Sequence, residues 1–98
     1  MDNSKLENIK KTVQLFKIYS DNTRLQIIDL LTDNEYCVQD IADDLGASQS
    51  AISHQLKQLR DMNCVHARKQ GKQVFYSLQD NHVKEIYLSA YHHITECD

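Results

Sequence analysis

The sequence predicts a mostly α-helical fold with one small β-hairpin, arranged as a winged helix–turn–helix in which four helices precede a two-stranded wing and a C-terminal helix follows it. Apolar residues recur at helical spacing through most of the chain, and the pattern changes to alternation only between residues 65 and 78. The chain has no proline and two glycines, Gly46 and Gly71, each where this arrangement needs a turn. With 98 residues, we expect one domain spanning 1–98, and a chain this short gains from burying further surface in a dimer.

Residues 37–63 predict two short helices joined by a tight turn. Gly46 can end the first helix with a left-handed residue, and Ser48 can cap the second by accepting a free N–H group. A helix–turn–helix has this form, and its second helix lies in the DNA major groove. An ordinary helical hairpin with a solvated polar face fits the same spacing. The two inward stripes consist of Val38, Ile41, Ala42 and Leu45, and of Ile52, Leu56 and Leu59.

The predicted DNA surface joins the polar face of the second helix to the basic tip of the hairpin. Residues 57–72 carry a net charge of +4 although the whole chain carries −3, so a local basic patch lies on an acidic body. Ser48 belongs to the predicted DNA surface, and we expect one set of side chains near base edges: Gln49, Ser50, Ser53, His54 and Gln55. A second set should contact mainly phosphates: Lys57, Arg60, Arg68, Lys69 and Lys72.

The flanking segments complete the predicted fold. Residues 5–19 form an amphipathic helix, and a second helix, capped by Asp21 or Asn22, runs to about Leu31. The hairpin strands alternate at Val65 and Ala67, and at Val74, Tyr76 and Leu78. The predicted apolar faces of the two helices consist of Leu6, Ile9, Val13 and Phe16, and of Leu25, Ile28 and Leu31.

The last segment, residues 79–97, is helical and carries two stripes. One stripe should pack on the protomer's own core and the other should meet a partner chain, which predicts a homodimer built from the first and last helices. The first stripe consists of Val83, Tyr87, Ala90 and Ile94. The second consists of His82, Ile86, Ser89, His93 and Glu96.

Four metal-ligand residue types lie in two pairs on this segment. Asp80 and His82 stand where the helix begins, and His93 and Glu96 are i, i+3 neighbours. The two histidines are eleven positions apart, which is roughly 16 Å along a helix and too far for one ion. An antiparallel second protomer would bring the two pairs together and create two equivalent sites per dimer. The alternative is that Asp80 is an N-cap and the histidines are surface groups.

The chain as a whole resembles the ArsR/SmtB family of winged-helix metal-sensing repressors. The resemblance lies in SDNTRLQIIDLL, EYCVQDIADDLGASQSAISHQLKQLRD, ARKQGKQVFYSL and the terminal D-x-H-x10-H-x2-E. The last pattern is the family's C-terminal-helix zinc motif, and it matches Asp80, His82, His93 and Glu96. The resemblance implies a metal-free dimer bound to an operator with an imperfect inverted repeat. Binding of Zn²⁺, with Co²⁺ as a substitute, would lower that affinity and allow an efflux or homeostasis gene to be expressed.

The cysteines depart from the pattern of the family's thiolate sensors, which carry C-V-C in the third helix. Here Cys37 is followed by Val38 and Gln39, so that site lacks its second thiolate. Cys37 and Cys64 are therefore expected to be buried thiols, and Cys97 a thiol at the end of a helix. Whether His92 or Cys97 joins the metal site stays open. The alternative function is a thiol-based redox or sulfide sensor of the same fold, which needs two cysteines within about 4.4–6.8 Å between Cα atoms.

Other classes of protein are not favoured. The sequence has no H-E-x-x-H or other catalytic pattern, and four protein ligands leave no open position on a metal, so we expect neither an enzyme nor a small-molecule substrate. No apolar run is long enough to span a membrane, and no signal peptide begins the chain. Three widely spaced cysteines do not make a disulfide framework, which favours the cytoplasm.

Overall fold

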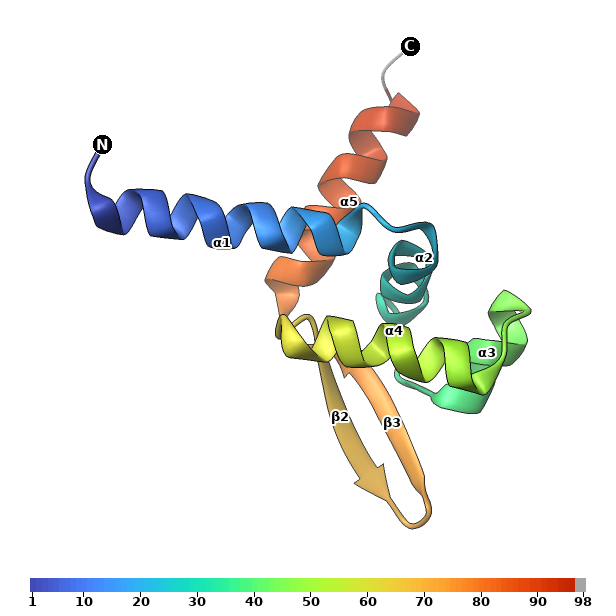
Figure 1. Ribbon diagram of the computed structural model, residues 1–98. Coiled ribbons are helices and arrows are strands. Elements are labelled where there is room, and N and C mark those ends of the chain that lie inside the picture. The colour runs from blue at the N-terminus through green and yellow to red at the C-terminus, as the bar shows by residue number, and fades with distance from the viewer. Residues whose placement is uncertain (97–98) are drawn as a thin grey trace.

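The computed structural model describes residues 1–96, and within them five α-helices pack together while a small antiparallel sheet projects from one side of them (Figure 1). This is the winged helix–turn–helix that the sequence predicts, with the wing between the fourth and fifth helices. The elements are α1 (Asn3–Tyr19), α2 (Asn22–Leu31), β1 (Tyr36–Cys37), α3 (Val38–Leu45), α4 (Gln49–Asp61), β2 (Val65–Gln70), β3 (Gln73–Leu78) and α5 (Asn81–Glu96). No helix within these residues combines the length and apolar character needed to cross a bilayer.

The predicted helix signals act where they were expected. Gly46 ends α3 with a φ of +65°, and the Ser48 hydroxyl caps α4 by accepting the Ala51 N–H at 3.0 Å. The carboxylate of Asp21 caps α2 in the same way, accepting the Arg24 N–H at 3.0 Å. The turn between the two helices of the helix–turn–helix is thus fixed by residues that can be identified from sequence alone.

The sheet contains one strand more than predicted. β2 and β3 form the expected hairpin, closed by Gly71 and Lys72, and Gly71 has the positive φ of +62° that this tight turn requires. A third strand, β1, pairs with the outer edge of β3, giving the order β1-β3-β2. β1 has only two residues, too few to show an alternating pattern, and this is why the sequence did not predict it.

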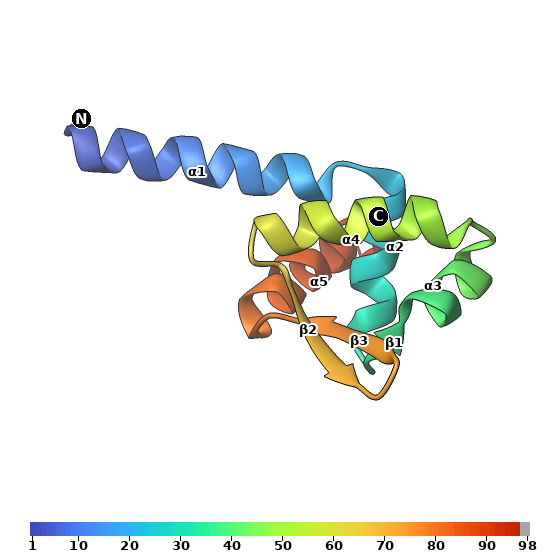
Figure 2. The same ribbon diagram turned by 60° about the horizontal axis from the view of Figure 1, so that its bottom comes forward.

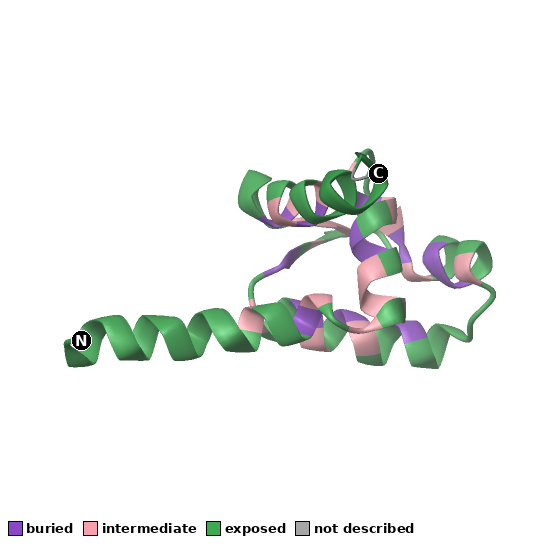
Figure 3. Ribbon diagram, turned by 90° about the horizontal axis from the view of Figure 1, so that it is seen from above, coloured by how far each residue is buried: buried purple, intermediate pink, exposed green. Residues whose placement is uncertain are grey.

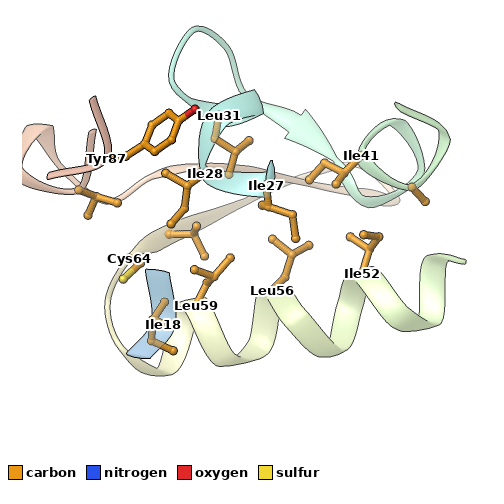
Figure 4. Close-up of a cluster of buried hydrophobic side chains, with 13 residues drawn as sticks. Ile18, Ile27, Ile28, Leu31, Ile41, Ile52, Leu56, Leu59, Cys64 and Tyr87 are labelled. Atoms are coloured by element: carbon orange, nitrogen blue, oxygen red, sulfur yellow. The ribbon is translucent and has the colours of Figure 1, made fainter. Parts of the chain in front are cut away.

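The core lies where α2, α3 and α4 meet (Figure 4). Ile27, Ile28, Ile41, Ile52 and Leu59 have no exposed surface, and Figure 4 shows the isoleucines of α2 above the row of apolar side chains of α4. Buried positions thin out toward the N-terminal half of α1, which is exposed along its length (Figure 3). The core therefore holds the helix–turn–helix together, and α1 extends away from it (Figure 2).

The predicted inward stripe of α5 is wrong in its second half. Val83 and Tyr87 are buried as expected, but Ala90 and Ile94 are exposed, Ile94 by 75%. The reason is geometric: the 16-residue helix runs past the end of the core, so only its first half lies against the protomer (Figure 1). Within residues 1–96, the apolar surface of the second half is left without a partner.

Candidate functional site

The outer face of α4 presents polar side chains beside the wing. Ser48, Gln49, Ser50, Ser53, His54, Lys57 and Arg60 are all exposed, as the sequence predicts. Gln49 and Ser53 line a polar hollow of about 290 Å³ that Lys72, at the tip of the wing, also lines. Helix and wing therefore form one continuous polar surface, although their residues are some twenty positions apart in the sequence.

Gln55 does not belong to this surface in the way the sequence predicts. Its side chain is half-buried, and its Oε1 accepts a hydrogen bond from Nη1 of Arg24 on α2 at 3.0 Å. The amide therefore lies on the side of α4 that faces the body of the protein. Residue type alone could not distinguish this position from its exposed neighbours.

Arg68, predicted to contact phosphate, has an acidic partner within the chain. Its guanidinium donates to both carboxylate oxygens of Glu35, Nη2 to Oε1 at 2.5 Å and Nε to Oε2 at 3.3 Å. It also lies 5.1 Å from the centre of the Phe75 ring. The hydrogen bond from Arg68 lowers the pKa of Glu35, so the pair stays ionised at neutral pH. The charge of Arg68, which is predicted from the sequence to contact DNA phosphate, is therefore partly neutralised by Glu35, a residue 33 positions away.

The two lysines at the wing tip differ from Lys57 and Arg68, which are both paired with a carboxylate. Lys57 lies 3.0 Å from Asp61, one turn along α4. Lys69 and Lys72 are exposed, and no carboxylate within residues 1–96 forms an ion pair with either of them. The strongest uncompensated positive charge on the wing is therefore at its tip.

Asp80 and His82 stand together at the start of α5. The carboxylate of Asp80 caps the helix by accepting the Val83 N–H at 3.2 Å, and it lies 3.6 Å from Nδ1 of His82. Both side chains are exposed, His82 by 85% and Asp80 by 50%. The capping role that the sequence left as an alternative is thus real, and it leaves the second carboxylate oxygen open to a further ligand.

His93 and Glu96 occupy the far end of α5, and both are exposed. Within residues 1–96, no group of three or more histidine, cysteine, aspartate or glutamate side chains is close enough to hold a metal ion. The pairs are thus separate in one protomer, as the length of the helix requires. Two imidazoles and two carboxylates are nevertheless a suitable donor set for Zn²⁺, and all four side chains are accessible to a second chain.

The first half of α5 is fixed to the body by two tyrosines. Tyr87 donates its hydroxyl to the carboxylate of Asp29 on α2 at 2.7 Å, and burial together with this bond raises the pKa of Tyr87 to about 12. Tyr19, at the end of α1, donates to the Val83 carbonyl at 2.9 Å. The Asp80–His82 pair at the start of α5 is thus held in a defined position relative to α1 and α2.

The described thiols are poorly suited to redox sensing. Cys37 and Cys64 are both buried, Cys64 completely, and neither forms a disulfide. Burial raises the pKa of the Cys64 thiol to about 11, and the negative charge of Asp80 adds to that shift. A reactive cysteine needs an accessible thiolate at neutral pH, and Cys64 has neither property. Cys97, for which sequence analysis leaves open a role as an additional metal ligand, lies outside the described residues.

Comparison with known proteins identifies the family. Residues 21–67 match the model described as "Bacterial regulatory protein, arsR family". A transcriptional repressor SmtB homolog from Synechocystis is 38% identical over 93 residues, which cover 95% of this chain and 70% of that protein. The chain belongs to the ArsR/SmtB family of winged-helix transcriptional regulators. A CadC homolog from Staphylococcus aureus, a cadmium resistance regulatory protein, is 37% identical over 91 residues and covers 92% of this chain and 75% of its own length.

Solved structures show the same architecture. A homodimeric winged helix–turn–helix DNA-binding domain from Mycobacterium bovis superimposes with a TM-score of 0.91 at 25% identity, covering 99% of this chain and 90% of that one. Reduced HlyU from Vibrio cholerae superimposes with a TM-score of 0.82 at 35% identity, covering 99% and 100%. This ArsR/SmtB-family protein is therefore a DNA-binding regulator and not an enzyme.

Proposed function

We propose that this protein is a zinc-responsive repressor that acts in the cytoplasm as a homodimer on an operator with an imperfect inverted repeat. The observation that carries the proposal is the position of four metal-ligand side chains in two exposed pairs at opposite ends of α5, within a family of metal-responsive regulators. Asp80 and His82 of one protomer and His93 and Glu96 of the other would hold Zn²⁺, and Co²⁺ should replace it. The bound ion would supply a cross-link between the two terminal helices.

The exposed apolar surface supports the dimer. Leu6, Ile9, Val13 and Phe16 on α1 are 41–56% exposed, and Phe16 lines an apolar hollow of about 300 Å³ with Ala90 and Ile94 of α5. Solitary exposed apolar residues are ordinary, but a continuous stripe on two adjacent helices is typical of a protein interface. A two-fold dimer through these helices would place two copies of α4 at a fixed spacing, which an operator with two half-sites would match.

A backbone link supports coupling between the metal ligands and the recognition helix α4. The Gln79 N–H, next to Asp80, donates to the Cys64 carbonyl at 3.0 Å, and the Cys64 N–H donates to the Leu59 carbonyl of α4 at 2.8 Å. Two backbone hydrogen bonds thus connect the residue next to Asp80 with α4, and a displacement of Asp80 could be transmitted through them. A carbonyl near Asn63, at the end of α4, is our candidate acceptor for the second ring N–H of a ligand histidine.

Titration of zinc into the protein bound to its own promoter tests the proposed function. We expect release of the DNA, with operator affinity falling by about a hundredfold, equivalent to about 2.7 kcal/mol of coupling. Cobalt should act similarly and magnesium should not, because Mg²⁺ prefers an all-oxygen ligand set. Release by cadmium alone would assign the protein to a different metal, and no release by any of these ions would contradict the proposed regulation.

The charges at the wing tip give a second test, on DNA binding itself. Lys69→Ala or Lys72→Ala should weaken binding to operator and unrelated DNA by a similar factor and lower the salt slope by about 1, because each lysine contacts phosphate.

Arg68→Ala should act in the same direction but more weakly, since Glu35 already neutralises part of its charge. Glu35→Gln should therefore strengthen binding to all DNA. Anisotropy titrations at several salt concentrations measure these effects. Loss of discrimination with unchanged affinity for unrelated DNA would contradict the phosphate assignment.

The thiol-based alternative would use the cysteines of this chain, and the likeness to reduced HlyU from Vibrio cholerae is in keeping with it. The two described cysteines argue against it here. Cys64 is fully buried and its pKa is raised, and Cys37 is also buried. The exposed ligand pairs on α5 therefore support metal as the signal better than thiol oxidation.

A further inference from the structure

Arg24 of α2 connects the end of α1 to the recognition helix. Its Nε donates to the Ile18 carbonyl at 3.0 Å and its Nη2 to the Lys17 carbonyl at 3.2 Å. Its Nη1 donates to the Oε1 atoms of Gln55, at 3.0 Å, and of Gln58, at 2.7 Å. Four of the five N–H groups of this half-buried guanidinium are thus used inside the protomer, which leaves little capacity to bind phosphate.

The contact with α1 has a simple physical origin. Ile18 and Lys17 lie in the last turn of α1, where carbonyls lack an N–H partner from a following helical turn. The Lys17 carbonyl also accepts from the N–H and the hydroxyl of Ser20, at 3.3 and 2.8 Å. A cation at this end of a helix is also stabilised by the helix dipole. Because the guanidinium is planar and rigid, its position on these two carbonyls fixes the direction in which Nη1 points toward α4. Ile18 itself belongs to the same buried cluster as Leu59 of α4 (Figure 4).

The contact with α4 continues to a side chain on the DNA-facing surface. Since Arg24 donates to Oε1 of Gln58, the Gln58 amide must present its Nε2 on the other side, where it lies 3.0 Å from Nε2 of His54. An amide nitrogen only donates, so the Nε2 atom of His54 must accept. A neutral imidazole has one donor and one acceptor, which leaves Nδ1–H of exposed His54 as a free donor.

We propose that Arg24 is a positioning residue that, through Gln58, orients the His54 ring for sequence-specific DNA contact and ties that orientation to α1. The proposal rests on the proposed DNA-binding function and names a determinant of its specificity. It also gives α1, the helix that carries the exposed apolar stripe, a side-chain connection to the recognition surface that does not pass through the wing.

The experiment compares Arg24→Met and Gln58→Met with the parent protein by two readouts. The first is the ratio of affinities for its own promoter DNA and unrelated DNA, which we expect to fall about tenfold in both variants because one base-edge contact is lost. Affinity for unrelated DNA should stay within about twofold of the parent. The double variant should be no worse than Arg24→Met alone, since the two residues act in one chain of hydrogen bonds.

The second readout needs no DNA. Imidazole nitrogen chemical shifts at about pH 8, where an ordinary histidine is neutral, should report the Nδ1–H tautomer of His54 in the parent and a mixture in both variants. Lys17→Ala is the matched control, because it removes a neighbouring charge but keeps the carbonyl that Arg24 uses; it should leave both readouts unchanged. Gln58→Met keeps the contacts of Arg24 with α1, so it remains informative if Arg24→Met does not fold.

The outcomes separate this inference from the proposed function. Parent-like specificity and His54 tautomer in Gln58→Met would overturn the relay, as would additive losses in the double variant. Failure of the parent protein to prefer its promoter would contradict the proposed function, while the tautomer readout would still test the Arg24–Gln58–His54 connection.

Discussion

Phe16→Glu should convert the protein into a monomer at micromolar concentration and weaken operator binding by about a hundredfold or more. Phe16 lies at the meeting point of the exposed faces of α1 and α5, and 56% of its surface is accessible in one protomer. A carboxylate there would have to be desolvated in a dimer, whereas in the monomer it remains in water. Loss of the second half-site contact removes the gain from bivalent binding. Sedimentation and anisotropy measure the two effects.

Gln14→Glu is the matched control for this substitution. It adds the same charge to the same helix at an exposed position away from the apolar stripe, so dimerisation and operator binding should stay at the parent level. Circular dichroism of Phe16→Glu should remain parent-like, because the residue contributes little to the core. A stable Phe16→Glu dimer, or a monomer that binds the operator as tightly as the parent, would contradict the proposed interface.

The helices and the hairpin could be predicted because their signals are local. Gly46 and Ser48 define the turn between α3 and α4 with backbone and capping chemistry that acts within four residues. The change from helical to alternating periodicity identifies the wing for the same reason. β1 could not be predicted, because a two-residue strand exists only through its pairing with β3, which is a contact between distant parts of the chain.

The candidate site could be predicted as a set of residue types but not as a network. Exposure of Ser53 and of the candidate metal ligands His82, His93 and Glu96 follows from helical spacing. Arg68 pairs with Glu35 and Arg24 with Gln58, and in each pair the residues are more than thirty positions apart. No local sequence pattern predicts either contact. Likewise, the apolar stripe on α5 indicates surface to be covered but does not distinguish the protomer's own core from a partner. For this reason the helical pattern predicts that Ile94 is buried in the protomer's own core, whereas its side chain is exposed in the structure.

His93→Ala should abolish the response to zinc while leaving metal-free operator binding within about twofold of the parent. His93 is exposed and no hydrogen bond joins its side chain to another residue within 1–96, so its removal should not disturb the fold. Glu96 alone would remain from that end of α5, and one carboxylate cannot complete the four-ligand set with Asp80 and His82 of the partner protomer. The hundredfold loss of affinity expected on zinc addition should then disappear, which is a loss of about 2.7 kcal/mol of coupling.

His92→Ala is the matched control, because it removes an adjacent exposed imidazole that points in a different direction around α5. It should keep both zinc binding and zinc-induced DNA release. Metal affinity, measured by competition with a chromophoric chelator, should fall in His93→Ala and stay unchanged in His92→Ala. Weak operator binding by metal-free His93→Ala would make that residue structural. Normal release of DNA by zinc in His93→Ala would place the sensing site elsewhere, and loss of the response in His92→Ala would make His92 a ligand.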